Sequence, residues 1–187
     1  MLRLFVALEL PSHLKHEMAW FKNETHKEIK DVKWVSEENL HITLKFLGNC
    51  EEELLPEIES GLKNSLKKFS PFDFYINGLG VFPSIKRARV LWVGIKSGGE
   101  NIVKLQQAIE ENFAKIGFAK DEKIFFPHIT FARLKNLYNV EKFFEKIEAK
   151  GFSESRVEVS NISLLRSSLM SQGPVYEKIL ELKLKTD

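Results

Sequence analysis

Two short segments of the chain carry a histidine followed two residues later by a threonine. They are His41-Ile42-Thr43 and His128-Ile129-Thr130. On a β-strand, residues i and i+2 share a face and lie about 6 to 7 Å apart, so each segment would present an imidazole beside a hydroxyl. An imidazole gains or loses a proton near neutral pH. The pattern therefore predicts two similar acid–base sites.

The spacing of the two segments indicates an internal repeat. His128 minus His41 is 87, and the same offset carries Leu4, Val6 and Leu47 onto Leu91, Val93 and Leu134. Two copies are too few for a solenoid but fit a pair of lobes related by an approximate two-fold axis. We expect a single bilobal domain over residues 1–187, with repeats at approximately 1–80 and 88–165 and with the two histidine strands meeting.

Hydrophobic periodicity predicts the elements that hold these segments. A first helix starts at Pro11-Ser12, with Leu14, Met18, Trp20 and Phe21 at its apolar positions. Further helices are expected at about 51–68, 101–116 and 140–149, and strands at 4–8, 34–35, 40–47, 72–76, 90–95, 128–134, 157–165 and 175–184. The predicted fold class is α+β, built from duplicated β-α-β-α-β units.

Strict alternation assigns faces within the histidine strands. It places Lys45 on the same face as the first histidine and threonine, with Phe46 on the buried face. It places Arg133 on the face opposite to the second histidine and threonine. Arg133 would then form an ion pair rather than contact a phosphate, unless the strand bulges.

Composition limits where charged ligands can bind. The chain has 28 Lys plus Arg against 26 Asp plus Glu, a net charge of +2, which is too small for a surface that binds nucleic acid everywhere. An anion site must be local. Lys86, Arg87 and Arg89 crowd a loop just before the strand predicted at residue 90. They are candidates for RNA phosphates, and a solubilising surface is the equal alternative.

Cys50 is the only cysteine, which excludes a disulfide within the chain and a cysteine-based zinc site and fits a reducing cytoplasm. The apolar start contains Arg3 and Glu9 and stops at Pro11, so it does not read as a signal peptide. No apolar run approaches the roughly 20 residues that a membrane span needs. We expect a cytoplasmic monomer without a membrane segment.

Paired imidazoles suit in-line displacement at phosphorus, where one group takes a proton from the nucleophile and the other gives one to the leaving group. The motif strands offer too few ligands for a catalytic metal, so we expect neither metal nor cofactor. Without a metal, the substrate should be intrinsically reactive, such as a strained five-membered cyclic phosphodiester. A 2',3'-cyclic phosphate at an RNA end meets this description.

At these motifs the sequence resembles the two-histidine phosphoesterase superfamily, and within it the RNA 2',3'-cyclic phosphodiesterases historically called 2'-5' RNA ligases. The similarity runs from end to end of the chain and includes residues 3–11, 34–35, 39–48, 82–83, 89–94, 127–133 and 173–176. The resemblance implies two antiparallel sheets around a central cleft, with metal-independent opening of the cyclic phosphate to a 2'-phosphate.

The resemblance also implies roles for the motif residues. His41 would be the general acid that protonates O3', His128 the general base that activates water, and Thr43 and Thr130 would hold the non-bridging oxygens. Joining of RNA ends through a 2'-5' linkage would be the same chemistry run backward, with a 5'-hydroxyl replacing water. On sequence grounds the pseudo-symmetry leaves the acid and base assignments interchangeable.

Two other functions stay open at this point. The same site could act on a small cyclic nucleotide or on a cyclic phosphate derived from ADP-ribose, in which case an oligonucleotide would have no advantage over a mononucleotide. The chain could also be a non-catalytic nucleotide- or RNA-binding module, which would bind without turnover.

Overall fold

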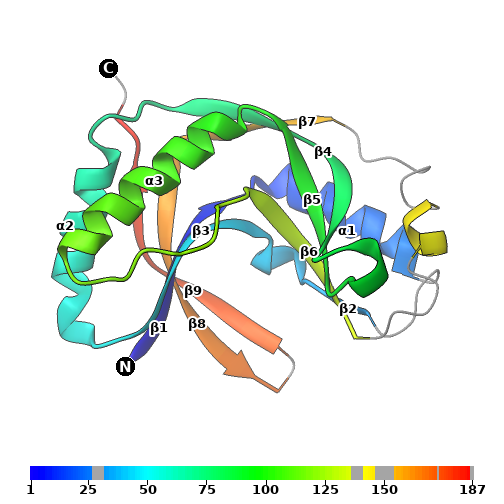
Figure 1. The fold of residues 1–187 in the computed structure, drawn as a ribbon, viewed down its shortest axis with the longest axis horizontal. Helices are drawn as coiled ribbons and strands as arrows, with labels where there is room; N and C mark the ends of the chain where they lie inside the picture. The colour runs from blue at the N-terminus through cyan, green and yellow to red at the C-terminus, as the bar shows by residue number, and fades with distance from the viewer. Residues whose placement is uncertain (27–31, 136–140, 146–153, 172, 186–187) are drawn as a thin grey trace.

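Two antiparallel sheets with helices on their outer faces make up the computed structural model, which describes residues 1–26, 32–135, 141–145, 154–171 and 173–185 (Figure 1). The four-stranded sheet A has the order β3-β1-β8-β9, with β1 (Leu2–Glu9), β3 (His41–Cys50), β8 (Asn161–Met170) and β9 (Gly173–Lys183). The five-stranded sheet B has the order β2-β6-β5-β4-β7, with β2 (Val32–Trp34), β4 (Phe72–Phe82), β5 (Val90–Ser97), β6 (His128–Leu134) and β7 (Ser155–Val159). The predicted α+β class is confirmed.

The α-helices described over their full length are α1 (Ser12–Thr25), α2 (Leu55–Leu66) and α3 (Gly99–Lys115), with 3₁₀ turns η2 (Glu37–Asn39), η3 (Glu52–Leu54) and η4 (Ile85–Arg87). Helix α1 follows Pro11 and buries Leu14, Met18 and Phe21 along one stripe. Trp20 was expected on this stripe but is 64% exposed. It lies two residues after Met18, which is about 200° of rotation around the helix.

Two predicted elements have different limits in the structure. The strand expected at 157–165 is two strands, because β7 ends at Val159 in sheet B and β8 starts at Asn161 in sheet A. The strand expected at 72–76 continues to Phe82. Of the helix expected at 140–149, residues 141–145 are helical and the others lie outside the described residues.

Each sheet combines strands from both halves of the sequence. Strand β4 pairs with β5 in sheet B, whereas β8 pairs with β1 in sheet A. The helices are exchanged as well. Phe21 of α1 packs on Phe131 of sheet B, with ring centroids 6.1 Å apart, and Glu110 of α3 binds Lys45 of sheet A.

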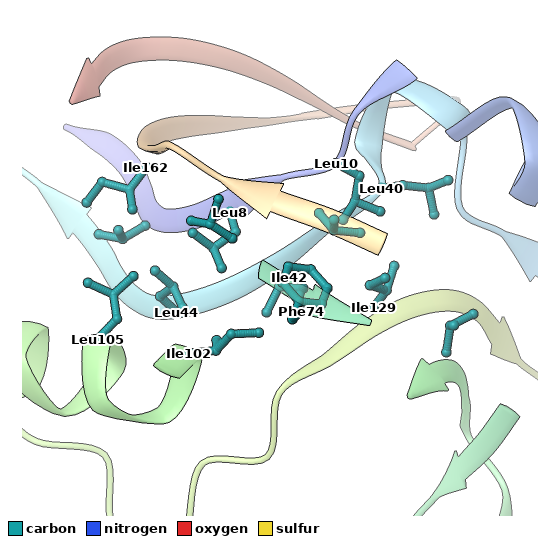
Figure 2. Close-up of a cluster of buried hydrophobic side chains, with 14 of the residues drawn as sticks. Leu8, Leu10, Leu40, Ile42, Leu44, Phe74, Ile102, Leu105, Ile129 and Ile162 are labelled. Carbon is teal, nitrogen blue, oxygen red and sulfur yellow. The ribbon is translucent and has the colours of Figure 1, made fainter. Parts of the chain in front are cut away.

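One hydrophobic core spans both sheets and the helices that cover them (Figure 2). It joins side chains of sheet A and sheet B to the inner face of α3, among them Leu8, Ile42, Leu44, Ile102, Leu105 and Ile129. Fully burying one such side chain contributes about 1.5 to 3 kcal/mol. The apolar residues of the histidine strands thus anchor these strands in the core, and the histidines and threonines between them point to the other face of each sheet.

A membrane-spanning helix is not found in the described part of the chain, since no helix there is both long and apolar enough.

Candidate active site

The histidine and threonine of each motif lie on one face of their sheet, as the residues opposite them in the neighbouring strand show. His41 pairs with Glu9 and Thr43 with Ala7. His128 pairs with Gly94, and Thr130 with Trp92. Directly opposed residues in antiparallel strands share a face. We call this face of each sheet the histidine face, and the face that carries Ile42 or Ile129 the core face.

A β-bulge follows the threonine of β3 and reverses the predicted faces. Ala7 pairs with Thr43 but Val6 pairs with Lys45, so Leu44 is the extra residue. Lys45 therefore turns to the core face, and Phe46 turns to the histidine face, where it is 67% exposed. The expectation that Lys45 shares the face of the first motif was wrong.

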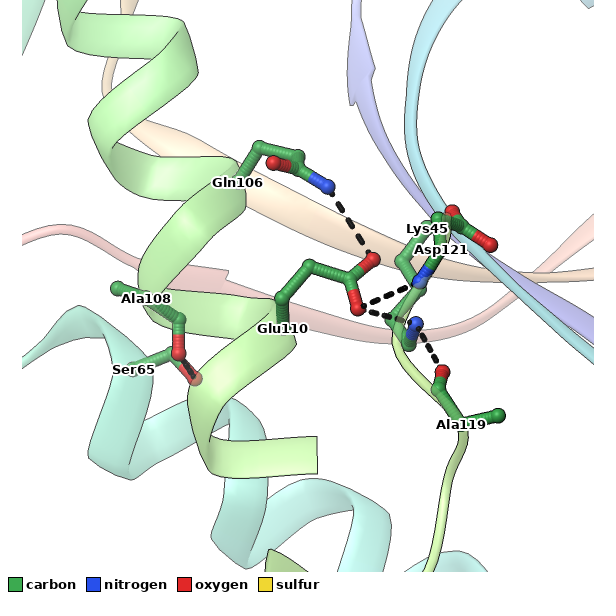
Figure 3. A network of polar contacts seen from close by, with 7 residues as sticks. All are labelled: Lys45, Ser65, Gln106, Ala108, Glu110, Ala119 and Asp121. Carbon is green, nitrogen blue, oxygen red and sulfur yellow. Dashed lines mark hydrogen bonds and ion pairs between the residues drawn. The ribbon is translucent and has the colours of Figure 1, made fainter. Parts of the chain in front are cut away.

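Buried Lys45 instead ties β3 to α3. Its Nζ donates to Glu110 Oε2 at 2.7 Å and to the carbonyl oxygen of Ala119 at 2.9 Å (Figure 3). Glu110 also accepts hydrogen bonds from the Gln106 amide and from the backbone N–H of Asp121. With 1% and 11% of the two charged side chains exposed, the pair is satisfied by its own network. Lys45 has a structural role here and does not face the motif residues.

An equivalent bulge in β6 brings Arg133 to the histidine face. Trp92 pairs with Thr130 but Leu91 pairs with Ala132, so Phe131 is the extra residue and is buried. Arg133 consequently follows Thr130 on the histidine face and is exposed. The face predicted for Arg133 was wrong, because strict alternation assumes that no extra residue interrupts the strand.

The strand register makes the two motif sites unequal. Trp92 takes the place of Ala7, an offset of 85 residues (92 minus 7), while the histidine strands keep the offset of 87. The opening strand of the second half is thus shifted by two residues relative to the sequence alignment. As a result, His41 lies opposite the carboxylate residue Glu9, and His128 lies opposite Gly94, which has no side chain.

The His41 imidazole is held at both nitrogens. Nδ1 donates to the carbonyl oxygen of Asn39 at 2.7 Å, so in the neutral ring Nε2 accepts from the Thr43 hydroxyl at 2.8 Å. The rings of Phe5 and Tyr176 lie 5.0 and 5.3 Å from the imidazole. This burial lowers the pKa of His41, and the hydrogen bond to Asn39 opposes it. Fixed rotation and tautomer suit Nε2 for proton transfer.

Charges around His41 act in both directions. The carboxylate of Glu9 raises the pKa of His41, whereas the positive charges of Lys15 and His128 lower it. Glu9 is itself bound by Lys178, at 2.8 Å, and by the hydroxyl of Ser163. Burial raises the pKa of Glu9, but these two hydrogen bonds hold it below its usual value, so the carboxylate is charged near neutral pH.

Asn39 connects His41 to the β8–β9 hairpin, a link that sequence reasoning missed. Its backbone carbonyl orients the imidazole, and its buried side-chain amide donates to the carbonyl oxygen of Pro174 at 2.7 Å. Tyr176, two residues further along β9, packs on His41. The sequence signal is the position of Asn39 two residues before the motif strand, where a turn residue is common.

The His128 imidazole is oriented in the same manner but by aromatic surroundings. Nδ1 donates to the carbonyl oxygen of Phe126 at 2.7 Å, which leaves Nε2 as the acceptor nitrogen of the neutral ring. The rings of Phe82 and Trp92 lie 5.0 and 6.3 Å away. Burial lowers the pKa of His128. The neutral ring is therefore favoured.

Gly80 makes room for the indole of Trp92 beside His128. A Cβ atom at Gly80 would lie 2.1 Å from the Trp92 ring, so only glycine permits this packing. The position of the Trp92 ring beside His128 thus depends on the absence of a side chain at Gly80 in the neighbouring strand β4.

The two motif strands meet across the sheets. Strands β3 and β6 contain residues with Cα atoms within 8 Å of each other, and the positive charge of His128 lowers the pKa of His41. The two imidazoles consequently lie within electrostatic range, one contributed by each sheet.

The candidate basic residues follow strand β4, whose last residue is Phe82. Lys86 and Arg87 are in η4, and Arg89 follows it, all three exposed. The segment is anchored by the backbone N–H of Arg89, which donates to the carbonyl oxygen of Phe82 at 2.7 Å. The Phe82 ring contacts His128, whereas the Arg89 guanidinium donates to the carbonyl oxygen of Lys135, just beyond the other end of β6. Among the described residues, no group of three or more His, Cys, Asp or Glu side chains is arranged to hold a metal ion.

Comparison with known proteins agrees with this architecture. Residues 11–169 match the family model described as the 2'-5' RNA ligase superfamily. A Methanocaldococcus jannaschii protein named RNA 2',3'-cyclic phosphodiesterase is 36% identical over 96% of this chain and 99% of its own length. A protein of the same name from Aquifex aeolicus is 35% identical over 96% and 95%.

Solved structures show the same fold. TT0787 of Thermus thermophilus has a TM-score of 0.80 at 24% identity, with 97% of both chains covered. E. coli LigT complexed with 3'-AMP has a TM-score of 0.75 at 21% identity, with 99% of both chains covered. From the length of the family match and the identity to these relatives, the chain belongs to the 2'-5' RNA ligase superfamily.

Proposed function

We propose that this protein is a phosphodiesterase that opens the 2',3'-cyclic phosphate at an RNA end and leaves a 2'-phosphate. The observation that carries the proposal is the pair of oriented imidazoles, one on each of two strands in contact, each sharing a face with a threonine hydroxyl. The activity named for the relatives from M. jannaschii and A. aeolicus supports the same reaction.

In the proposed mechanism, His128 Nε2 takes a proton from water as the water oxygen attacks phosphorus. His41 Nε2 gives its proton to O3' as the bond from phosphorus to O3' breaks. The hydroxyls of Thr43 and Thr130 donate to the non-bridging oxygens. The product carries a 2'-phosphate and a 3'-hydroxyl. With a 5'-hydroxyl of a second RNA end as the nucleophile in place of water, the same displacement would form a 2'-5' linkage.

The unequal surroundings of the two histidines support this assignment of acid and base. The proton donor must be charged before the reaction, and the Glu9 carboxylate opposite His41 raises the pKa of that ring, against the burial and the Lys15 charge that lower it. The proton acceptor must be neutral, and His128 lies opposite Gly94 among aromatic rings. The register shift of two residues makes the two sites unequal, and this difference is the basis of the proposed assignment.

The proposal extends to how RNA is held. Lys86, Arg87 and Arg89 are exposed and follow the strand that carries Phe82, and they would contact phosphates of the RNA chain. No metal or other cofactor enters the mechanism, so EDTA should leave turnover unchanged, and a strict requirement for a divalent ion would contradict it. Both imidazoles come from one chain, which supports action as a monomer, and the single buried cysteine supports a cytoplasmic location.

End-group analysis of the product from a 2',3'-cyclic oligonucleotide tests activity and bond choice together. A 2'-phosphate is expected, and a 3'-phosphate or no turnover would contradict the proposal. Since one acid or base typically contributes 10² to 10⁴-fold, His41→Ala and His128→Ala should each raise the barrier by roughly 3 to 5.5 kcal/mol. Near-normal turnover by either variant would exclude its assigned role.

A further inference from the structure

Two exposed cations stand directly opposite each other at the end of the histidine strand of sheet B. Lys33 of β2 pairs in register with Arg133 of β6, so their side chains share a face. Like charges in this position destabilise a strand pair. No acidic side chain of the described residues forms an ion pair with Lys33 or Arg133, although several other exposed cations are paired in this way. The pair is therefore left for an anion from outside.

The bulge at Phe131 determines which face this pair occupies. Without it, Arg133 and Lys33 would point to the core face. With it, His128, Thr130 and Arg133 follow one another on the histidine face, at steps of about 6 to 7 Å along the strand. The cationic pair thus lies one step beyond the threonine that is assigned to the reacting phosphate.

The pair also faces sheet A. The positive charge of Arg133 acts on the hydroxyl of Tyr176, as does that of Arg3, while the Tyr176 ring packs on His41. The ammonium group of Lys33 lies beside Gly173 at the start of β9, where a Cβ atom would be 3.7 Å from Nζ. The cations are consequently next to the site that both sheets form, rather than on a remote surface.

We propose that Lys33 and Arg133 form a subsite for the phosphodiester that adjoins the terminal cyclic phosphate of an RNA substrate. The guanidinium binds two phosphate oxygens at once, and the ammonium adds a point charge. This subsite rests on the proposed function and narrows it. A cyclic mononucleotide has no second phosphate to occupy the subsite, so the pair selects polynucleotide ends.

The experiment compares kcat/KM for a 2',3'-cyclic mononucleotide, a 2',3'-cyclic oligonucleotide and a cyclic phosphate of ADP-ribose. Lys33→Ala should lower the ratio of oligonucleotide to mononucleotide kcat/KM roughly tenfold at low salt, the size expected for one hydrogen bond to a charged group. The salt dependence on the oligonucleotide should weaken by about 0.7 in the logarithmic slope, the value for one phosphate contact of a single strand. Lys33→Arg should restore the ratio.

Lys104→Ala is the matched control, because it removes the same charge from an exposed position on α3. It should leave the ratio unchanged. An unchanged ratio in Lys33→Ala, or equal losses on both substrates, would overturn the subsite. Faster turnover of the ADP-ribose substrate, with the same dependence on Lys33, would overturn its assignment to RNA. Absence of wild-type turnover on every cyclic phosphate would instead contradict the proposed function itself.

Discussion

Each catalytic imidazole of the proposed mechanism is fixed by a backbone carbonyl at Nδ1, from Asn39 for His41 and from Phe126 for His128. This arrangement leaves both Nε2 atoms for proton transfer and makes the two rings alike in tautomer. They differ in the charge opposite them. The two rings thus share one mode of orientation and differ in the residue opposite them, which is the difference that the proposed acid and base roles use.

The pH profile tests this difference. Burial lowers the pKa of both histidines below the ordinary value of 6.5. A base must be neutral and an acid charged, so kcat/KM should follow a bell whose maximum lies below pH 6.5. The measurement is kcat/KM on a cyclic mononucleotide across pH, which reports the free enzyme. A maximum on the alkaline side would contradict the burial argument.

Glu9→Gln should shift one limb of that bell. Its carboxylate raises the pKa of His41, so its removal lowers that pKa and moves the alkaline limb to lower pH if His41 is the acid. Lys15→Gln should move the same limb to higher pH, because the Lys15 charge lowers the pKa of His41. Movement of the acid limb instead would show that the roles of the two histidines are exchanged.

Most of the motif chemistry was accessible from residue types alone. His41, Thr43, His128 and Thr130 stand where alternation places them, because no irregularity occurs between histidine and threonine. The role of Asn39 was not accessible, since it depends on a hydrogen bond to Pro174, which is 135 residues further along the chain. Long-range partners of this kind leave no periodic signal in a single sequence.

The bulges at Leu44 in β3 and Phe131 in β6 determine which side chains of these strands face the site. Alternation failed for Lys45, Phe46 and Arg133 for one reason, namely the extra residue after each threonine. Both bulges occupy the same place in their motif strands, at Leu44 and Phe131. An extra apolar residue in an apolar strand has the same composition as its paired neighbours, so the sequence could not reveal either bulge.

The buried Lys45–Glu110 pair offers a test of this reassignment. Lys45→Ala should destabilise the protein by about 3 to 5 kcal/mol, because it leaves the Glu110 carboxylate buried without its partner. The double variant Lys45→Met/Glu110→Leu should recover most of that stability, since both charges are gone. Urea denaturation measures the change in the free energy of unfolding.

Lys63→Met is the comparison for that measurement. Lys63 forms an exposed pair with Glu59 on α2, which should contribute no more than about 0.5 kcal/mol. The double variant should also keep its turnover of a cyclic mononucleotide, because Lys45 is on the core face. Loss of turnover in a stably folded double variant would argue that Lys45 acts on the substrate after all.

For the whole molecule, the exchange of strands and helices means that neither half of the sequence contains a complete sheet. Strand β1 needs β8, and β5 needs β4. The order of elements predicts two repeated units, but the pairing of strands across the two halves depends on packing that no local pattern encodes. If the repeat predicted at 1–80 and 88–165 is real, its two units are interlocked through these pairings.

Separate expression of residues 1–87 and 88–187 tests this interlocking. Each half alone should lack cooperative unfolding. In the first half β1 would lack its partner β8 and α1 would lack β6, and in the second half β5 would lack its partner β4 and α3 would lack β3. Mixing the halves should restore cooperative unfolding and turnover of a cyclic mononucleotide, as measured by circular dichroism and product release. Native-like folding of either half in isolation would contradict it.

The pairing of Leu4 with Arg166 has a consequence for how the protein is made. Strand β1 is synthesised long before β8, so one of its edges stays open until β8 has been made. The ring that packs on His41 arrives later still, on β9. Translation that stops before β8 and β9 should therefore yield an inactive chain, so turnover reports that both strands have been made.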